Sequence, residues 1–386
     1  MHVGLDAIPL ATPRTGVGHY TFELARHLAR IAPVDQFELI SPFAFTEEVE
    51  GKAQQNLPAN LRLVQPKIDS LKRRWFALGL PLYIKQSGLS LFHGTNYEVP
   101  LWGKSPSVLT IHDLSLLLHP KTHEARLVRR GRTRLPLMAR AASHIITPSE
   151  SVKREVSEYL KINPTKITVI PEAPREIFRP ADDKEVAEIR RRLNVEDEFI
   201  LSVGTIEPRK NLLTLVKAFP EVLRSINSCP QLVVVGREGW LTHELFSEIE
   251  RSGIEKNRLR FTGYLSDTEL RALYSSCRAF VYPSLYEGFG LPPLEAMACG
   301  APVVASRVPS LIEAGKAASL VAPLDVQALA QSIINLLSDE NERRSRSLAG
   351  LEHAAQFSWE KTAQATLAVY KKTLGRKGTQ SAGGAT

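Results

Sequence analysis

Short apolar runs alternate with amphipathic stretches along the whole chain. In the first half, the runs predict strands at residues 2–7, 37–41, 61–66, 89–94, 107–112, 143–147 and 167–171. In the second half, they predict strands at 199–205, 232–236, 259–264, 279–283, 301–306 and 319–322. Most runs are apolar at nearly every position, which indicates strands buried on both faces. Helical patterns such as 211–226, 240–252 and 325–337 lie between them, so the sequence predicts an α/β protein with parallel sheets.

The number of strands predicts how the chain is divided. Two sets of about six strands are too many for one sheet around a single core, so we expect two Rossmann-like domains facing each other across a cleft. The first should span residues 1–175 and the second 176–357, with the boundary in the proline-containing stretch 172–196. A last helical pattern at 358–374 should pack back on the first domain, and residues 375–386, rich in Gly, Ser and Ala, should form a disordered tail.

The composition is that of a soluble globular protein. Hydrophobic residues make up 43% of the 386 positions, and the mean hydropathy is −0.13. No apolar stretch approaches the roughly 20 residues that span a bilayer. The N-terminus enters a strand pattern at once, so no signal peptide is expected. Cys229, Cys277 and Cys299 lack metal-ligand spacing, and together these features predict a cytoplasmic protein.

The excess positive charge lies in the first half of the chain. The net charge is +8, and residues 1–175 hold 23 Lys and Arg against 15 Asp and Glu, whereas residues 176–386 hold 26 of each. Residues 121–140 alone carry seven basic side chains and one acid. This charge distribution has two explanations. The basic residues form a solvated face, or they attract the anionic inner face of a membrane or a phosphorylated acceptor. Nucleic acid is not expected as a partner, because no nucleic-acid-binding module accompanies the charge.

Residues 287–295 carry the most specific pattern. Glu287 and Glu295 enclose two glycines and two prolines, directly after the predicted strand 279–283. Gly288 and Gly290 leave backbone amides uncovered, and the prolines suit the first turn of a helix. Amides at a helix start can hold a phosphate, and carboxylates beside them can accept hydrogen bonds from sugar hydroxyls. The pattern therefore favours a nucleotide-sugar site, although both acids could instead cap a helix.

Two cations follow the first predicted strand of the second domain. Gly204 ends the strand, and Arg209 and Lys210 lie at the expected start of the helix 211–226. A guanidinium and an ammonium at a helix start can neutralise a departing diphosphate, although two surface charges in a loop would give the same pattern. Further strands of this domain end near residues that we expect to wall the nucleotide base, namely Gly236, Tyr264 and Leu265.

Weaker candidates follow strands of the first domain. Gly16 and Gly18 lie between the strand 2–7 and a helix expected to begin near His19, where they form either a tight turn or an amide site for phosphate or acceptor. The dinucleotide pattern GxGxxG is not completed, which disfavours a nicotinamide enzyme. His112 and Asp113 come at the end of the strand 107–112, where His112 is either a packed side chain or a residue of the reaction centre and Asp113 is an acceptor-side candidate. Asn96 and Tyr97 are acceptor-side candidates that could equally be packing residues.

Together these motifs resemble the retaining glycosyltransferases of family 4, which have the GT-B fold. The resemblance covers nearly the whole chain, through Gly16 and Gly18, His112 and Asp113, Pro148 and Ser149, Gly204 with Arg209 and Lys210, and Glu287 with Glu295. The pattern of residues 112–115 and 119–120 looks like that of bacterial mannosyltransferases of polysaccharide assembly.

The resemblance also implies roles for these residues. Arg209 and Lys210 would bind the donor diphosphate, with Gly16 nearby. Glu295 would hold the ribose hydroxyls, and Glu287 would contact the donor sugar together with the amides of Phe289 and Gly290. Gly288 and Leu291 of the same segment are further donor-site candidates. His112 would face the reactive carbon of the sugar. The first domain would then be the acceptor side and the second the nucleotide-sugar side.

The predicted function is transfer of a hexose from a nucleoside diphosphate to a glycan or lipid-linked hydroxyl, with retention of configuration. GDP-mannose is the leading donor and a UDP-hexose the next. No Asp-x-Asp motif is present, so neither a metal nor another cofactor is expected. A nucleotide-sugar epimerase would differ by forming a sugar isomer without any acceptor. A dinucleotide oxidoreductase would change nicotinamide fluorescence, and a non-catalytic sugar-binding subunit would bind nucleotide without turnover.

Overall fold

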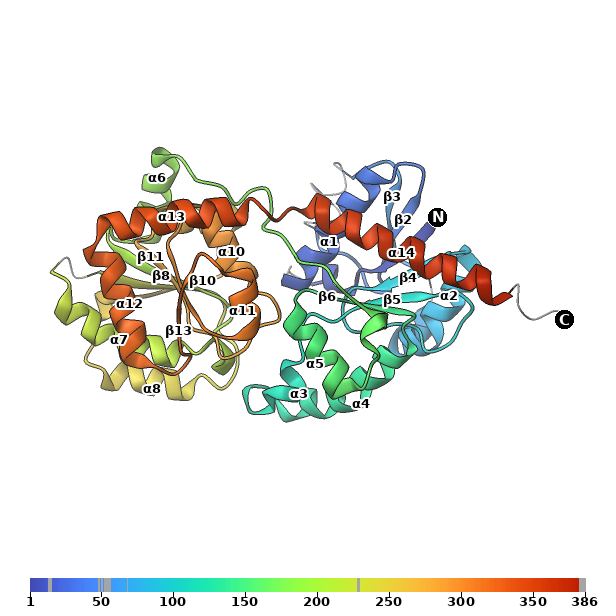
Figure 1. Cartoon of the computed structure of the whole chain (residues 1–386), viewed down its shortest axis with the longest axis horizontal. Coiled ribbons are helices and arrows are strands. Elements are labelled where there is room, and N and C mark those ends of the chain that lie inside the picture. Colours follow the sequence, from blue (N-terminus) through green and yellow to red (C-terminus); the bar gives the residue numbers. More distant parts are fainter. Residues whose placement is uncertain are drawn as a thin grey trace. The chain divides into compact units, whose positions relative to one another are not determined.

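The structure is a computed structural model that describes residues 1–12, 16–47, 49, 51, 57–67, 69–227 and 230–381. The chain divides into two compact units (Figure 1). Unit 1 comprises Met1–Leu114, Arg129–Glu172 and Ser358–Thr386, and unit 2 comprises Ser115–Val128 and Ala173–Phe357. The division at Glu172 lies close to the expected boundary. Ser115–Val128, which the sequence led us to expect in the first domain, belongs with unit 2.

Unit 1 is built on a seven-stranded parallel sheet in the order β3-β2-β1-β4-β5-β6-β7. Its strands are β1 (His2–Asp6), β2 (Gln36–Ile40), β3 (Leu61–Val64), β4 (Leu91–Gly94), β5 (Ser107–Thr110), β6 (His144–Thr147) and β7 (Ile167–Val169). All the predicted strands of the first half are therefore confirmed. The order reverses between β1 and β4, which makes their carboxyl ends the place where a ligand is expected.

Unit 2 is built on a six-stranded parallel sheet in the order β10-β9-β8-β11-β12-β13. Its strands are β8 (Phe199–Val203), β9 (Gln231–Val235), β10 (Leu259–Gly263), β11 (Ala279–Tyr282), β12 (Val303–Ser306) and β13 (Ser319–Val321). The strands predicted for the second half are confirmed as well. Here the order reverses between β8 and β11, so both units have a Rossmann-like arrangement.

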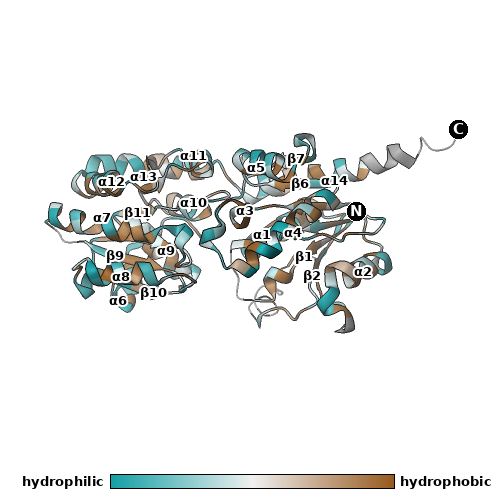
Figure 2. Ribbon diagram, turned by 90° about the horizontal axis from the view of Figure 1, so that it is seen from below, coloured by the Kyte–Doolittle hydropathy of each residue, from teal (hydrophilic) through white to brown (hydrophobic). Residues whose placement is uncertain are grey.

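Helices connect the strands and carry apolar and polar residues on opposite faces (Figure 2). The helices whose residues lie wholly or mainly in unit 1 are α1 (Gly16–Ile31), α2 (Leu80–Ser87), α4 (Ala125–Ala141), α5 (Glu150–Leu160) and α14 (Trp359–Ser381). Those of unit 2 are α3 (Ser115–Leu118), α6 (Asp183–Leu193), α7 (Leu212–Ser225), α8 (His243–Arg251), α9 (Asp267–Ser276), α10 (Leu291–Ala298), α11 (Pro309–Ala314), α12 (Val326–Ser338) and α13 (Glu340–Ala354).

In unit 2, helices cover both faces of the sheet and bury its central strands. In β9, Val233 and Val235 pack in one hydrophobic cluster, and Leu232 and Val234 pack in another on the opposite face. The first cluster includes residues of α9, α10 and α11, and the second includes residues of α7, α8 and α12. The thiols of Cys277 and Cys299 are free and buried, and Cys229 lies outside the described residues.

The last helix, α14, returns to unit 1 as predicted. Its Tyr370 is fully buried and places its hydroxyl 2.6 Å from Nδ1 of His93 on β4. Thr362 donates a hydrogen bond of 2.8 Å to the carbonyl of Pro171 at the end of the unit 1 core. The helix α14 ends at Ser381, within the stretch 375–386 that the sequence predicts as a disordered tail, and residues 382–386 lie outside the described part of the chain.

The Tyr370 contact should contribute measurably to the stability of unit 1. Burial lowers the pKa of His93 to about 3, so the ring is neutral and needs a partner at each nitrogen. Nε2 has one in Thr110, 2.8 Å away. Tyr370→Phe removes the partner of Nδ1 and should reduce the free energy of unfolding by about 1–3 kcal/mol in urea titrations. Tyr159→Phe, at a tyrosine 58% exposed on α5, is the control, and an equal effect of both changes would contradict this assignment.

Candidate active site

The donor-site candidates of unit 2 follow two neighbouring strands. β8 and β11 pair directly at the point where the strand order reverses. Residues 204–210 follow β8, and residues 283–290 follow β11. Because both segments leave the same edge of a parallel sheet, the cations Arg209 and Lys210 come close to Glu287. The spacing of these motifs after their strands therefore brings them together in space.

Glycines shape this edge of the sheet. Gly204 and Gly236 have φ angles of +148° and +149°, and a Cβ on Gly236 would lie 1.9 Å from the carbonyl oxygen of Gly204. The ends of β8 and β9 can approach this closely only without that side chain. Gly290, with φ +110°, caps α10, where a Cβ would lie 2.4 Å from Leu311. Pro292 and Pro293 lie in the first turn of α10, as predicted.

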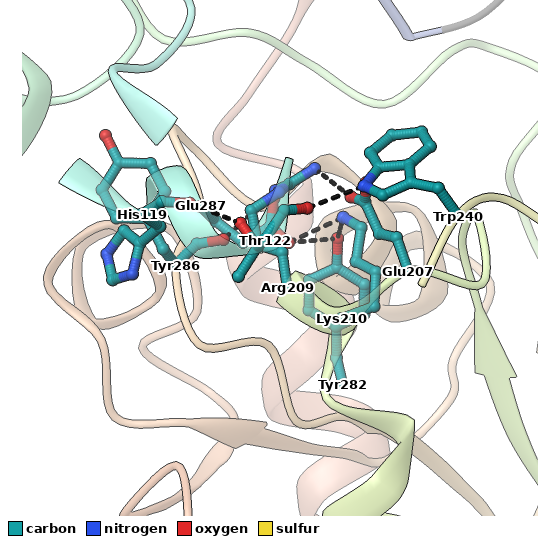
Figure 3. A network of polar contacts seen from close by, with 9 residues as sticks. All are labelled: His119, Thr122, Glu207, Arg209, Lys210, Trp240, Tyr282, Tyr286 and Glu287. Atoms are coloured by element: carbon teal, nitrogen blue, oxygen red, sulfur yellow. Dashed lines mark hydrogen bonds and ion pairs between the residues drawn. The ribbon is translucent and has the colours of Figure 1, made fainter. Parts of the chain in front are cut away.

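Glu287 is the centre of a buried polar cluster, which we call the Glu287 cluster (Figure 3). Lys210 Nζ lies 2.7 Å from Glu287 Oε1, and Arg209 Nη1 lies 3.2 Å from Oε2. Tyr282 donates to Oε1 at 3.0 Å and accepts from Lys210 Nζ at 2.6 Å. Arg209 also bonds to Glu207 Oε1 at 2.6 Å, so two cations and two carboxylates share the cluster. The sequence interpretation missed Glu207, although it stands two residues before Arg209.

The electrostatics of the cluster decide the protonation of Glu287. Burial alone would raise the pKa of this carboxyl, but the charges of Lys210 and Arg209 outweigh it and lower the pKa to about 2. Burial lowers the pKa of Lys210 and raises that of Glu207. Glu287 is thus ionised at neutral pH and has both oxygens engaged. Such a group suits the positioning of cations and hydroxyls rather than proton donation.

The segment Ser115–Val128 contacts two residues that lie beside the Glu287 cluster, Trp240 and Tyr286. Trp240 donates from Nε1 to the backbone oxygen of Thr122 at 2.7 Å, and the His119 ring lies 4.8 Å from the ring of Tyr286. The backbone oxygen of Tyr286 in turn accepts from Arg209 at 3.2 Å (Figure 3). The roles of Thr122, Trp240 and Tyr286 were missed from the sequence, because the contacts join positions more than a hundred residues apart.

The remaining candidates of unit 2 are distributed over several elements. Glu295 lies buried on α10, with Oε1 3.6 Å from Arg175 Nε. Leu265 and Phe289 pack in the hydrophobic core, so only their main chains are available to a ligand. Tyr264, in contrast, is 56% exposed, and the guanidinium of Arg237 lies 5.0 Å from its ring centroid. Gly288 is buried and Leu291 is the first residue of α10.

In unit 1, His112 is held at both ring nitrogens. Nε2 lies 2.8 Å from the backbone oxygen of Thr95, and Nδ1 lies 3.0 Å from Oε1 of Glu172. A carbonyl oxygen only accepts, so Nε2 carries a hydrogen, and Nδ1 shares a second proton with the carboxylate. Burial alone would lower the pKa of His112, but the hydrogen bond and charge of Glu172 raise it above the usual value. His112 is therefore an oriented, readily protonated ring rather than a free base, and Glu172 was missed from the sequence.

The neighbours of His112 include two further candidates. Asp113 donates its backbone N–H to the hydroxyl of Tyr97 at 3.0 Å, and the ring of Tyr97 lies 5.9 Å from that of His112. Tyr97 has φ +62°, in the left-handed region that is costly for a residue with a side chain. The contact with the amide of Asp113 helps to hold this backbone conformation, so Tyr97 is part of the surroundings of His112.

The glycine candidates of unit 1 differ from expectation. The helix α1 begins at Gly16 rather than near His19, so Gly16 and Gly18 lie in its first turn.

Ser149, part of the motif with Pro148, accepts from the backbone N–H of Val152 and caps α5. The serine thus has a structural role there.

The described residues also bear on metal binding and on membrane spans. Within those ranges, no group of three or more His, Cys, Asp and Glu side chains is placed to hold a metal ion. Over the same part of the chain, no helix combines the length and apolar character needed to span a bilayer. Association with an anionic membrane surface stays a prediction.

Comparison with known proteins identifies the family. The family model described as Glycosyltransferase Family 4 matches residues 14–173, and the one described as Glycosyl transferases group 1 matches residues 183–352. The O-antigen chain mannosyltransferase B of Escherichia coli is 32% identical over 94% of this chain and 97% of the relative. The O-antigen chain mannosyltransferase RfbU of Salmonella typhimurium is 26% identical over 76% of this chain and 79% of the relative.

Solved structures agree in fold. The Anabaena protein Alr3699/HepE, in complex with UDP and glucose, superposes with a TM-score of 0.73 at 21% identity, covering 96% of this chain and 99% of that one. A sucrose-phosphate synthase from Thermosynechococcus elongatus gives a TM-score of 0.76 at 22% identity, covering 97% and 100% of the two chains. The chain belongs to the family 4 glycosyltransferases, is an enzyme of the glycosyltransferase class, and has the GT-B fold.

The pairing of His112 with Glu172 predicts a change in titration. Glu172→Gln keeps the size of the side chain but removes the charge and the hydrogen bond that raise the pKa of His112. The pKa of His112, followed by NMR of its ring, should therefore fall. Glu158→Gln, at an exposed residue of α5, should leave that pKa unchanged.

The same pair predicts a pH dependence of stability. Because the pKa of folded His112 lies above the ordinary value of 6.5, the stability from this pair is fully present below pH 6.5 and is lost as the pH rises through the folded pKa. As the pH rises above 6.5, urea titrations should show a smaller decrease in the free energy of unfolding for Glu172→Gln than for the unmodified protein. Equal losses together with an unchanged His112 titration would contradict the pairing.

Proposed function

We propose that the protein transfers mannose from GDP-mannose to a hydroxyl of a glycan or lipid-linked acceptor, with retention of the anomeric configuration. In this proposal unit 2 holds the donor and unit 1 the acceptor. The observation that supports it most is the Glu287 cluster, which holds Arg209 and Lys210 at the carboxyl ends of β8 and β11. Anionic ligands of parallel sheets bind at this position.

The donor-binding roles follow from the charges at this edge. The planar guanidinium of Arg209 can bond to two phosphate oxygens at once, and the Lys210 ammonium supplies a second positive charge. On donor binding, the diphosphate takes over the hydrogen bonds that Glu287 now accepts from these cations. Glu287, with the amides of Phe289 and Gly290, then contacts the sugar. Glu295 on α10 holds the ribose hydroxyls, and Gly236 and Tyr264 border the base.

The proposed mechanism is a same-face displacement. A double displacement needs a carboxylate nucleophile close to the anomeric carbon, whereas Glu287, the candidate at this site, contacts the hydroxyls of the sugar in this proposal. Instead, the bond between the anomeric carbon and the diphosphate oxygen breaks, and the acceptor oxygen bonds to that carbon on the same face. The acceptor proton passes to the leaving diphosphate, whose charge is stabilised by Arg209 and Lys210.

The preference for mannose rests on relatives. The Escherichia coli and Salmonella relatives bear the name mannosyltransferase, and so does the MMP alpha-(1->4)-mannosyltransferase of Mycolicibacterium hassiacum, 31% identical over 62% of this chain and 56% of the relative. A UDP-hexose is the second candidate donor, because the Anabaena structure of the same fold holds UDP and glucose. A panel of donors separates the two.

The donor test measures binding and slow hydrolysis across a panel of nucleotide sugars. At equal concentrations, the donor that binds most tightly raises the unfolding midpoint most, and a ligand at 100 times its Kd adds about 2.7 kcal/mol of stability. GDP-mannose should therefore raise the midpoint more than GDP-glucose or UDP-hexoses. NMR of the product should show mannose released in the anomeric configuration of the donor. A larger rise of the unfolding midpoint with a UDP-hexose would contradict GDP-mannose as the donor. A product of inverted configuration would contradict retention.

The role of the cations is tested in the same assay. Lys210→Ala, checked for an intact fold by circular dichroism, should lower the rate of donor cleavage by about 10²–10³-fold, because the charge on the leaving diphosphate loses a donor. Lys217→Ala removes the same charge from an exposed position of α7 and should stay close to the unmodified rate. Near-normal cleavage by folded Lys210→Ala would refute the proposed site.

A further inference from the structure

Unit 1 contains a pocket at the point where the order of its strands reverses. The pocket has a volume of about 560 Å³, in the range of small-molecule sites. Asp6 at the end of β1 and Ile8 line it on one side, and Asn96 and Glu98 shortly after β4 line it on the other. It therefore occupies the same place in its sheet as the Glu287 cluster does in the sheet of unit 2.

Cations from two separate segments converge on this pocket. Among the described residues that line it, the cations are Lys72, Arg73, Arg74, Arg130 and Arg134, and the carboxylic acids are Asp6 and Glu98. Arg130 and Arg134 of α4 both bond to Glu98, with nitrogen–oxygen distances of 3.0 and 2.6 Å. One carboxylate cannot neutralise two guanidinium groups, and the 72–74 segment adds further positive charge. The pocket thus favours an anionic ligand.

The guanidinium groups indicate which anion is favoured. Arginine forks match the oxygens of a phosphate or carboxylate better than lysine does, and four of the five cations of the pocket are arginines. Arg73 and Arg74 are exposed, and Arg134 of α4 is half-buried. A phosphate placed between these two segments could bond to guanidinium groups from both.

The other walls of the pocket are apolar and aromatic. Phe43 is 44% exposed and Leu101 is 49% exposed, and both line the pocket together with Trp75 and Phe76. Residues Trp75–Gly79 form a π-helical turn, a distortion that is frequent at functional sites. Trp102 supports this turn by donating from its ring nitrogen to the backbone oxygen of Ala77. Apolar surface beside converging cations fits a ligand that joins a phosphate to an apolar group.

Asp6 adds a hydrogen-bonding group at the base of the pocket. Its side chain is buried and accepts from the backbone N–H of Ile8 at 3.2 Å. Burial raises the pKa of Asp6 to about 7. Together with Asn96, this carboxyl can hold a ligand hydroxyl, which a site for a bare phosphate would not need.

We propose that this pocket binds an acceptor that carries a phosphate ester. The phosphate lies between Arg73 and Arg74 on one side and Arg130 and Arg134 on the other. An apolar group of the ester lies against Phe43 and Leu101, and Asp6 and Asn96 hold a hydroxyl of the acceptor. The inference rests on the proposed function, since it names the class of acceptor for that transfer.

Binding without donor tests this pocket separately from transfer. Isothermal titration calorimetry would compare decyl phosphate, below its micelle concentration, with glucose 1-phosphate and with the uncharged decyl maltoside. Decyl phosphate should bind more tightly than glucose 1-phosphate, which assigns a lipid-linked source of the phosphate. Equal binding of the two phosphates assigns a soluble ester and overturns the apolar part of the proposal. No binding of either phosphate overturns the whole.

Variants show whether the phosphate binds at the proposed place. Arg73→Gln with Arg74→Gln should weaken decyl phosphate binding by about tenfold or more, because two charge-assisted contacts are lost. The same is expected of Arg130→Gln with Arg134→Gln, and lysine at these two positions should restore part of the affinity. Arg132→Gln removes one charge from an exposed position of the same helix outside the pocket lining and should change binding less than twofold.

Two outcomes would contradict the location. If Arg132→Gln weakens binding as much as the pocket variants do, the cations act as a diffuse charged surface. The same conclusion would follow if the protein sediments with phosphatidylglycerol vesicles and if both double variants and Arg132→Gln weaken this sedimentation equally. The binding measurement contains no nucleotide sugar. A negative result therefore contradicts the pocket proposal alone, and a negative donor panel contradicts the proposed function without affecting the measurement of phosphate binding.

Discussion

The ion pair of Glu287 with Lys210 and Arg209 is the interaction on which the candidate site depends. All three side chains are largely buried, and a buried charge is tolerated only when it is paired and hydrogen-bonded. Removing one member of such a group typically costs about 3–5 kcal/mol, because its partner is left uncompensated. The cluster is therefore stable as it stands and also presents two cations that a diphosphate can engage.

Parallel topology explains why polar chemistry gathers where it does. The central strands of both sheets are buried and mostly apolar, so most polar side chains that can meet a ligand lie where the strands end. In each unit the order reverses once in the middle, between β1 and β4 and between β8 and β11. The Glu287 cluster follows one reversal, and the basic pocket follows the other. One structural rule thus places the proposed donor and acceptor groups, each within its own unit.

Much of this could be predicted from the sequence, because strand burial and glycine geometry are local properties. Every strand of both sheets is visible as an apolar run, and Arg209, Lys210 and Glu287 follow such runs directly. Glu172 and Trp240 could not be found in this way, since their partners His112 and Thr122 lie 60 and 118 positions away. The assignment of Ser115–Val128 to unit 2 also depends on tertiary contacts.

A crystal structure with the nucleoside diphosphate product bound tests the central claim most directly. The account predicts that phosphate oxygens lie within hydrogen-bond distance of the Arg209 guanidinium and of Lys210 Nζ, at the carboxyl ends of β8 and β11. It also predicts that Glu287 gives up at least one of its present bonds to these cations. A diphosphate bound elsewhere, with both cations still on Glu287, would contradict it.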